Sequence, residues 1–249
     1  MFGRWKRSKT VEPYFSVSHV YDFMMDHVDY GMWAKYCASL VHPYGRIKRI
    51  VEGGCGTGSL LVELAKLGFK TAGFDRSLAM LERAEKKGCR NIWQGDLTQF
   101  SIKTQCDAFF CLYDTIQYLT WNEIRQMARH VFASLKSDGF FLFDVVTEHH
   151  VSSYWADYYE TFRFQNRKVI RRTFYDREKR RLSSELVVKS PGRIHEKEVH
   201  QQHVYRLRDI ERLMKKSGFR KLGRFRDFTF REGDEKSDRI HFLFRKEVP

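Results

Sequence analysis

The feature that most constrains this chain is a glycine-rich turn between an apolar strand and an apolar helix, in the segment IVEGGCGTGSL at residues 50–60. The apolar residues before the turn read as a short buried strand, and those after it recur at helical spacing through residue 67. Because glycine lacks a Cβ atom, Gly54, Gly56 and Gly58 permit positive φ and leave bare backbone against which a ligand can lie. The segment predicts an α/β unit that binds a nucleotide-like cofactor.

The residues around the glycines indicate which kind of cofactor the turn accepts. A dinucleotide fingerprint is G-x-G-x-x-G, and counting from Gly54 its third glycine would fall on Ser59. Glu52 stands at the end of the strand, where its carboxylate would repel a phosphate and attract a cation such as an amino group. The turn therefore favours a cofactor that carries positive charge.

The pattern E-x-G-x-G-x-G after a first strand resembles motif I of the class I S-adenosyl-L-methionine (SAM) dependent methyltransferases. The resemblance implies SAM as the cofactor, with Glu52 facing its amino group. It also implies that the cofactor lies against the backbone of Gly53, Gly54, Gly56 and Gly58.

Two further acidic residues follow in the order that this family shows. The segment KTAGFD places Asp75 at the end of a second strand, about 20 residues after the first glycines, and Arg76 and Met80 follow it. The segment NIWQGDL places Asp96 and Leu97 after a third. The resemblance implies that Asp75 binds the ribose hydroxyls and that Asp96 and Leu97 lie at the adenine. The alternative is that both aspartates are ordinary helix caps or turn residues.

Residues 11–40 are rich in aromatic side chains, and their spacing predicts two short helices. The segment from Tyr21 to Trp33 resembles an N-terminal lid, Y-D-x-x-M-x-H-V-D-Y-x-x-W, that lies over the cofactor in similar methyltransferases. Aromatic faces can stabilise a sulfonium cation, and a closed lid excludes water. We expect Tyr21, Tyr30 and Trp33 to face the site, while Phe23 and Met25 pack elsewhere.

The end of the fourth strand, predicted over residues 106–112, resembles the segment C-L-F-D-S-L-N-Y-L of one methyltransferase branch. Strand ends at the carboxyl edge of an open parallel sheet face the ligand crevice. We expect Cys111 and Leu112 beside the cofactor, and Asp114 and Tyr118 toward the substrate. For Tyr118 a packed position in a helix is an equal alternative.

The remaining pattern completes the predicted fold. The pattern predicts a helix over 123–135, a turn at 136–139 and a strand over 140–146. Alternating stretches follow between residues 154 and 205, and they read as three or four antiparallel strands. A helix at 209–216 and strands at 219–230 and 240–244 follow. The expected fold is α/β: a Rossmann-like seven-stranded methyltransferase sheet with helices on both faces and an antiparallel β cap inserted after strand five. The expected parts are a helical lid (1–45), a SAM-binding core (46–150), the β insertion as a substrate cap (151–205), and a C-terminal helix and strands (206–249).

The insertion, with H-x-Y/F-x-L leading into the last helix, resembles the branch of sugar-amine N,N-dimethyltransferases and bacterial methyltransferase-domain proteins of unassigned substrate. This resemblance is specific for the cofactor and unspecific for the methyl acceptor.

The net charge of +14 is unevenly distributed. Residues 10–162 hold 15 Lys and Arg against 18 Asp and Glu, whereas residues 163–249 hold 26 against 13. A basic second half suits RNA or another polyanion, although a solvated surface explains it equally and no RNA-binding motif accompanies it. No apolar run reaches the ~18 residues of a membrane span, and the basic N-terminus lacks the apolar segment of a secretory signal. We expect a cytoplasmic protein with no membrane partner, as a monomer or homodimer.

Cysteine and histidine patterns argue against a metal site. The five cysteines contain no C-x-x-C pair, so we expect reduced thiols in or near the core. His200 and His203 are an odd number of residues apart and would point to opposite faces of a strand. His149, His150 and His203 are candidate substrate contacts, because the chain after strand five and the cap should border the acceptor.

The expected function is transfer of a methyl group from SAM to N or O of a small-molecule acceptor. Alignment of the nucleophile supplies most of the acceleration, and a base is needed only if the acceptor arrives protonated. Asp114, Tyr118, His149 and His203 are candidates for that base, and the choice stays open. The alternatives are a methyltransferase acting on RNA, a SAM-binding protein without activity, and an NAD-dependent oxidoreductase, which Glu52 and Ser59 disfavour.

Overall fold

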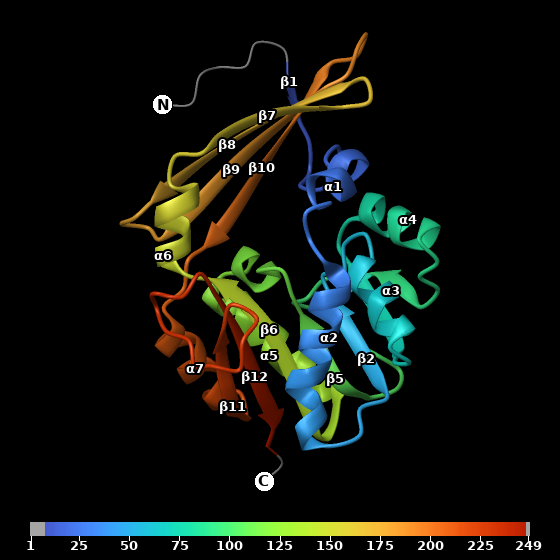
Figure 1. Ribbon diagram of the computed structural model, residues 1–249, viewed down its shortest axis with the longest axis vertical. Helices are drawn as coiled ribbons and strands as arrows, with labels where there is room; N and C mark the ends of the chain where they lie inside the picture. The colour runs from blue at the N-terminus through green and yellow to red at the C-terminus, as the bar shows by residue number, and fades with distance from the viewer. Residues whose placement is uncertain (1–7, 248–249) are drawn as a thin grey trace.

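The computed structural model describes residues 8–247, so the basic segment before Ser8 lies outside the described residues. A seven-stranded sheet forms the lower body of the molecule (Figure 1). Its strands, in the spatial order β11-β12-β6-β5-β2-β3-β4, are β11 (Phe219–Arg226), β12 (Arg239–Lys246), β6 (Leu135–Val146), β5 (Cys106–Cys111), β2 (Arg49–Gly53), β3 (Lys70–Asp75) and β4 (Ile92–Gln94). Strands β6 to β4 pair in parallel, and β12 pairs antiparallel with both β6 and β11. The predicted seven-stranded sheet with a final antiparallel pair is confirmed.

Helices cover both faces of this sheet. On one face α2 (Tyr30–Val41) and α3 (Ser59–Lys66) pack on Ile50, Phe110 and Leu142. On the other, α5 (Trp121–Ser134) and α7 (Leu207–Lys216) pack on Phe109 and Phe141. Successive strand residues point to opposite faces, so a continuous apolar run such as Phe109-Phe110 supplies both cores. Helix α4 (Leu78–Lys86) packs against the β3–β4 edge, and the short 3₁₀ turn η1 (His42–Tyr44) follows α2.

The start of β6 differs from the prediction. A turn was expected at residues 136–139, but β6 begins at Leu135 and continues through Asp138, whose φ is +62°. Its pairing with β5 is irregular between Cys106 and Ala108. The turn signal in KSDG therefore marks a kink inside a strand rather than a gap between a helix and a strand.

A five-stranded sheet lies above the core in Figure 1, in the order β1-β10-β9-β8-β7. Its members are β1 (Ser8–Thr10), β7 (Tyr159–Phe164), β8 (Arg167–Asp176), β9 (Arg181–Lys189) and β10 (His195–His203). Strands β7 to β10 form an antiparallel meander, as the alternating pattern predicts. The pairing of β1 with β10 in parallel was not predicted. The chain reaches this sheet from β6 through α6 (Glu148–His150) and the helical turn η3 (Val151–Trp155).

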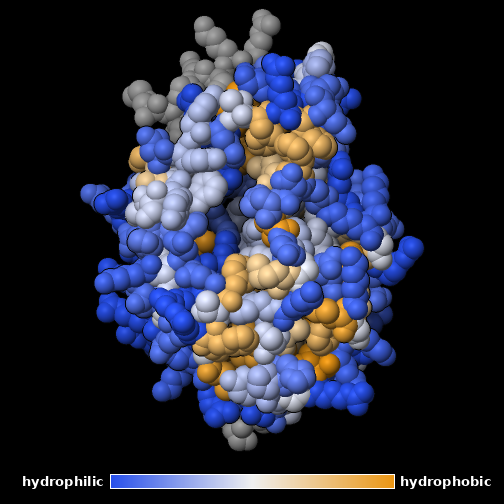
Figure 2. Space-filling view, in the orientation of Figure 1, coloured by the Kyte–Doolittle hydropathy of each residue, from blue (hydrophilic) through white to orange (hydrophobic). Residues whose placement is uncertain are grey.

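The carboxyl ends of β2, β3, β4 and β5 meet at the edge of the core that faces the five-stranded sheet. Helix α1 (Ser18–Met24) lies between the two sheets and beside α4 (Figure 1). The surface is hollowed where the two sheets approach each other (Figure 2).

Two further sequence expectations can be compared with this fold. All five cysteines are buried free thiols, as predicted. In residues 8–247 no helix is both long and apolar enough to cross a bilayer.

Candidate active site

The glycine turn between β2 and α3 is held by the neighbouring strand. The backbone N–H groups of Gly54 and Cys55 donate to the carbonyl oxygen of Phe74 on β3, at 2.8 and 3.0 Å. Gly54 has φ +76°, and a Cβ added there would lie 2.5 Å from Cγ2 of Thr115. A side chain at this position would therefore meet both backbone strain and the 3₁₀ turn η2 (Thr115–Tyr118) that follows β5.

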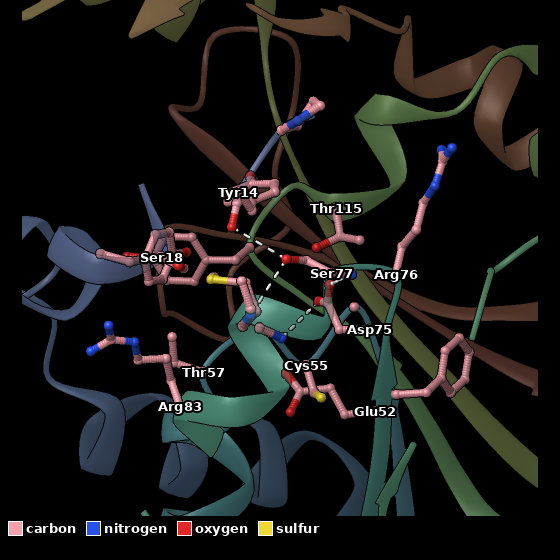
Figure 3. Close-up of a pocket in the computed structure, with 18 of the residues that line it drawn as sticks. Tyr14, Ser18, Glu52, Cys55, Thr57, Asp75, Arg76, Ser77, Arg83 and Thr115 are labelled. Carbon is pink, nitrogen blue, oxygen red and sulfur yellow. Dashed lines mark hydrogen bonds between the residues drawn. The ribbon is translucent and has the colours of Figure 1, made fainter. Parts of the chain in front are cut away.

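Glu52 is an acidic residue enclosed at the floor of the turn (Figure 3). Only 4% of its surface is exposed, and its Oε2 atom has no hydrogen-bond partner among the described residues. Burial, together with the nearby Asp75 carboxylate, raises the pKa of Glu52 to about 8. A buried carboxylate without a partner is costly, so the site is completed by a ligand that brings a cation or a hydrogen-bond donor.

The two aspartates that were predicted at the strand ends both line the same cavity and also hold turns. Asp75 Oδ2 accepts from the N–H of Gly56 at 2.9 Å, and its Oδ1 accepts from the N–H of Ser77 at 2.8 Å. Asp96 Oδ1 accepts from the N–H and hydroxyl of Thr98, at 2.8 and 2.7 Å. Both aspartates therefore stabilise turns, as the alternative interpretation predicts, and both also lie at the cavity wall.

These residues surround a cavity of about 870 Å³. The predicted cofactor residues that line it are Tyr21, Trp33, Glu52, Gly54, Gly56, Asp75, Arg76, Met80, Asp96, Leu97 and Leu112. Gly53, Gly58 and Cys111 do not. A Cβ at Gly53 would lie 2.6 Å from Leu97 Cδ2, a Cβ at Gly58 would lie 2.5 Å from Cys89 Sγ, and Cys111 is fully buried. The first two positions require glycine for packing behind the turn.

Tyr14 and Thr115 also line the cavity, although the sequence did not single them out for it, and Ser77, which follows Asp75 as in similar methyltransferases, lines it too. Ser77 caps α4, and its Oγ donates to the carbonyl oxygen of Tyr14 at 3.2 Å (Figure 3). Tyr14 itself adopts φ +64°. No local signal predicts positive φ for a tyrosine, so its position could not be read from the sequence.

Comparison with known proteins shows what the chain is similar to. Residues 50–139 match the family model described as a methyltransferase domain. A protein of Geobacillus sp. (strain WCH70) named as a methyltransferase is 29% identical over 245 residues, covering 94% of this chain and 99% of that protein. These similarities support a class I SAM-dependent methyltransferase.

Solved structures share the fold of this methyltransferase. An S-adenosylmethionine-dependent methyltransferase from Clostridium acetobutylicum ATCC 824 superposes with a TM-score of 0.80 at 20% identity, over 94% of this chain and 99% of that one. The sugar N-methyltransferase KedS8 from Streptoalloteichus sp ATCC 53650 superposes with a TM-score of 0.75 at 17% identity, over 100% of this chain and 96% of that one.

The residues of the methyltransferase fit SAM as cofactor. The orphaned oxygen of Glu52 suits an ammonium group. A Cβ at Gly56 would find only Met80 Cε, at 3.4 Å, so bare backbone meets open cavity there. Among the described residues no cluster of three or more His, Cys, Asp or Glu side chains could hold a metal ion.

The N-terminal segment that was predicted as a lid lines one side of the cavity, with Tyr14, Ser18 and Tyr21 among its residues. Lys87 at the end of α4 donates to Asp22 of α1 at 2.6 Å, to Thr57 Oγ1 at 2.8 Å and to Ser59 Oγ at 2.7 Å. Thr57 Oγ1 also donates to Asp22 at 2.7 Å. This polar cluster, named here the Lys87 latch, ties the lid helix α1 to the glycine turn. Trp33 of α2 stacks on Tyr113 with ring centroids 4.9 Å apart.

A second cavity of about 690 Å³ lies beside the cofactor cavity of the methyltransferase, below the five-stranded sheet. The two share Tyr14, Tyr21, Tyr113 and Tyr118 as lining residues. Of the predicted substrate residues, Asp114 and Tyr118 line the second cavity.

His149 and His203 line neither cavity. His150, which was also predicted as a substrate contact, lines the second cavity, and so does His200, which was not. His203 stacks on Tyr205 with ring centroids 5.7 Å apart. His200 lies on the other side of β10 from His203, where it is buried and hydrogen-bonds to Tyr118. The odd separation of the two histidines therefore places them apart, as expected, but with His200 at the cavity.

Asp114 is engaged by other side chains. Both Tyr113 and Asp114 adopt positive φ, +63° and +50°, at the end of β5. Arg239 Nη2 donates to Asp114 Oδ1 at 3.0 Å, and Gln202 Nε2 donates to its Oδ2 at 2.6 Å. Arg239 also pairs with the buried Asp144. Because these donors occupy its oxygens, Asp114 acts as a wall of the cavity that is fixed in place rather than as a free base.

Proposed function

We propose that this methyltransferase transfers the methyl group of SAM to an amino or hydroxyl group of a small molecule held in the second cavity. The observation that carries the proposal is the junction of the two cavities at four shared tyrosines. An acceptor seated there would lie next to the cofactor, in a space closed by the lid and the five-stranded sheet. Such closure positions a nucleophile and excludes water.

An amine is the favoured acceptor group. Asp26, Asp114 and Glu160 line the second cavity against the two cations Arg171 and Arg239, and the buried Asp144 lies behind Arg239. An excess of carboxylates attracts a cationic ligand. The aromatic members of the wall, among them Trp155, Tyr158 and Phe162, suit a compact ring or an ammonium. The fold shared with the sugar N-methyltransferase KedS8 agrees with this choice.

The cofactor roles follow the same reasoning. We infer that Glu52 binds the ammonium group of SAM, that Asp75 binds the ribose hydroxyls, and that Asp96 and Leu97 border the adenine. When bound, SAM supplies an electrophilic methyl group on a sulfonium sulfur. The protein binds both reactants, aligns them at the tyrosine junction and shields the sulfonium with Tyr21 and Trp33.

Turnover of methyl-labelled SAM with matched acceptors tests the proposal. The panel pairs small amines, including amino sugars, with the alcohols that replace each amino group by hydroxyl. We expect label in one or more amines and little or none in the matched alcohols. Label in alcohols alone would contradict the preference for amines, and no label in either set would contradict the small-molecule proposal.

The basic second half keeps methylation of RNA as the competing function. Transfer of label to RNA, with binding that weakens steeply as salt rises, would favour that alternative. We expect no transfer to RNA, because carboxylates outnumber cations among the residues that line the acceptor cavity and would repel a polyanion.

A further inference from the structure

Four side chains form a continuous hydrogen-bonded series that starts where the two cavities meet. Tyr14 and Tyr118 line both cavities, and their hydroxyl oxygens are 2.7 Å apart. The Tyr118 hydroxyl lies 3.1 Å from Nδ1 of His200, and His200 Nε2 lies 3.0 Å from Oε2 of Glu198. None of the cofactor roles proposed above uses these groups.

Glu198, at the inner end of the series, is a buried carboxylate with many donors. Its Oε1 accepts from the N–H of Ser16 at 2.6 Å, the hydroxyl of Ser16 at 2.7 Å and the N–H of Val17 at 2.8 Å. Its Oε2 accepts from the N–H of Tyr14 at 2.7 Å as well as from His200. Burial by itself would raise the pKa of Glu198, but the hydrogen bonds from His200, Ser16 and Val17 lower it below its ordinary value. Glu198 is therefore ionised and accepts hydrogen bonds only.

An ionised Glu198 fixes one end of the series, because His200 Nε2 must donate to it. When the imidazole is neutral, its Nδ1 is then the acceptor and Tyr118 donates to it. Tyr118 has one hydroxyl proton, so Tyr14 donates to the Tyr118 oxygen. The oxygen of Tyr14 is then left as the acceptor at the cavity end. Burial, then the mutual proximity of the phenols, raises the pKa of Tyr14, and burial raises that of Tyr118, so both remain protonated at neutral pH.

The other charged groups around His200 are paired among themselves. Arg171 on β8 pairs with Glu160 on β7 at 3.7 Å, and Asp114 pairs with Arg239. The residue of β9 in register with His200 is Ser184, which carries no charge. Among residues 8–247, Glu198 is thus the charged group that hydrogen-bonds to His200, and a proton arriving at Nδ1 would be stabilised by it.

The position of Tyr14 depends on the same carboxylate. A tyrosine at φ +64° is strained, and such strain persists only when surrounding contacts impose it. The bond from the Tyr14 N–H to Glu198 and the contact of its ring with His200, at 4.8 Å between centroids, impose it here. Strain at a cavity wall that a buried carboxylate maintains indicates a positioned group.

We propose that Tyr14, Tyr118, His200 and Glu198 form a proton relay that removes a proton from an ammonium acceptor before methyl transfer. The inference rests on the proposed function, an amine in the second cavity. An N–H bond of the ammonium breaks and an O–H bond forms on Tyr14, whose own proton passes to Tyr118. The Tyr118 proton passes to Nδ1 of His200. The amine keeps the electron pair that it needs as a nucleophile, and His200 becomes an imidazolium beside Glu198.

The ring nitrogens of His200 test the relay without any acceptor. The protein is labelled with ¹⁵N in its histidine rings, saturated with S-adenosylhomocysteine (SAH), and followed by NMR from pH 6 to pH 9, with His200→Gln to assign the signal. We expect the neutral ring to be the Nε2–H tautomer. Tyr118→Phe should shift the Nδ1 resonance. An Nδ1–H tautomer, or an imidazolium over the whole range, would overturn the relay.

Kinetic measurements with an amine that the acceptor panel identifies test whether turnover uses the relay. His200→Gln and Tyr118→Phe should each lower kcat by about 100-fold, with little change in KM or in the dissociation constant of SAH. Both variants should also flatten the dependence of kcat on pH. His195→Gln, on the same strand but lining neither cavity, is the matched control and should leave kcat unchanged.

The two proposals fail in different ways. Normal turnover of an amine by His200→Gln, or an equal loss at every pH, would contradict the relay while leaving the proposed function intact. Absence of turnover with every amine and alcohol would contradict the proposed function instead.

Discussion

At the scale of single residues, the charge state of Glu52 links pH to stability. Its pKa of about 8 in the folded protein exceeds its ordinary value of 4.5. The folded chain therefore holds a proton that the unfolded chain releases above pH 4.5, so the stabilisation from this proton is complete below pH 4.5 and is lost as the pH rises to 8. We expect the free energy of unfolding of the cofactor-free protein to fall over this range, and to fall less in Glu52→Gln. Equal pH profiles in urea unfolding would contradict this.

Binding of the cofactor depends on the same Glu52 carboxylate, but it changes with pH in the opposite direction. An ammonium group pairs with the ionised form, so the affinity for SAH in the wild type, relative to Glu52→Gln, should increase as the pH rises toward 8. The variant should bind SAH more weakly by ~1.5–3 kcal/mol at pH 8, because it loses a hydrogen bond to a charged group. Calorimetry of both proteins from pH 6 to pH 9 measures the ratio of their two dissociation constants for SAH. Titration of SAH itself affects both constants equally and cancels in this ratio.

Gly54 offers a second prediction, with a matched control in Gly68. Both have positive φ, +76° and +90°, so alanine is strained at either site. A Cβ at Gly54 would lie 2.5 Å from Thr115, whereas a Cβ at Gly68 would find no atom within 4 Å. Gly68→Ala should cost roughly 1 kcal/mol of stability and leave SAH binding unchanged. Gly54→Ala should cost more and weaken SAH at least tenfold. Similar thermal midpoints and SAH affinities for the two variants would argue against a close-packed turn.

The residue scale also marks where sequence reasoning ends. Glu52, Asp75 and Asp96 could be predicted because each stands at a fixed offset from a strand end. Choosing His200 over His203 could not, since the choice depends on how β10 faces Tyr118 and Glu198 across the fold. Likewise, Gly53 and Gly58 match the cofactor motif but serve packing, and the motif does not distinguish those tasks.

At the scale of elements, the Lys87 latch should control how fast the lid opens. Lys87→Met removes the hydrogen bonds from Lys87 to Asp22, Thr57 and Ser59 and leaves the direct bond from Thr57 to Asp22. We expect faster hydrogen exchange in residues 18–24 and faster release of SAH, with a small change in global stability, since the pair with Asp22 is partly exposed. Lys86→Met, one residue earlier on the exposed side of α4, is the control. Unchanged exchange in α1 would show that packing, not the latch, holds the lid.

Elements with their own periodicity could be predicted, and those defined by distant partners could not. Strands β8 and β9 are nine or more residues long and carry β-branched residues, and helix α5 carries a capping box at Thr120 and Glu123. In contrast, β1 is three residues long and exists through its parallel pairing with β10, almost 190 positions away. A segment that short carries no period from which pairing could be inferred.

At the scale of the whole molecule, two sheets create the site together. The core supplies the cofactor cavity at its carboxyl edge, and the five-stranded sheet closes the second cavity above it. The lid segment belongs to both, because Glu198 of the upper sheet holds Tyr14, Ser16 and Val17, while Lys87 of the core holds Asp22. Cofactor binding, acceptor binding and lid closure are therefore coupled through one short segment.

The most direct measurement is calorimetric titration of the protein with SAH and, separately, with NAD. The structure predicts one SAH per chain, binding that Glu52→Gln and Gly54→Ala weaken, and no binding of NAD, because a pyrophosphate would face Glu52. Binding of NAD without SAH, or SAH affinity that neither substitution changes, would contradict the assignment of the cavity.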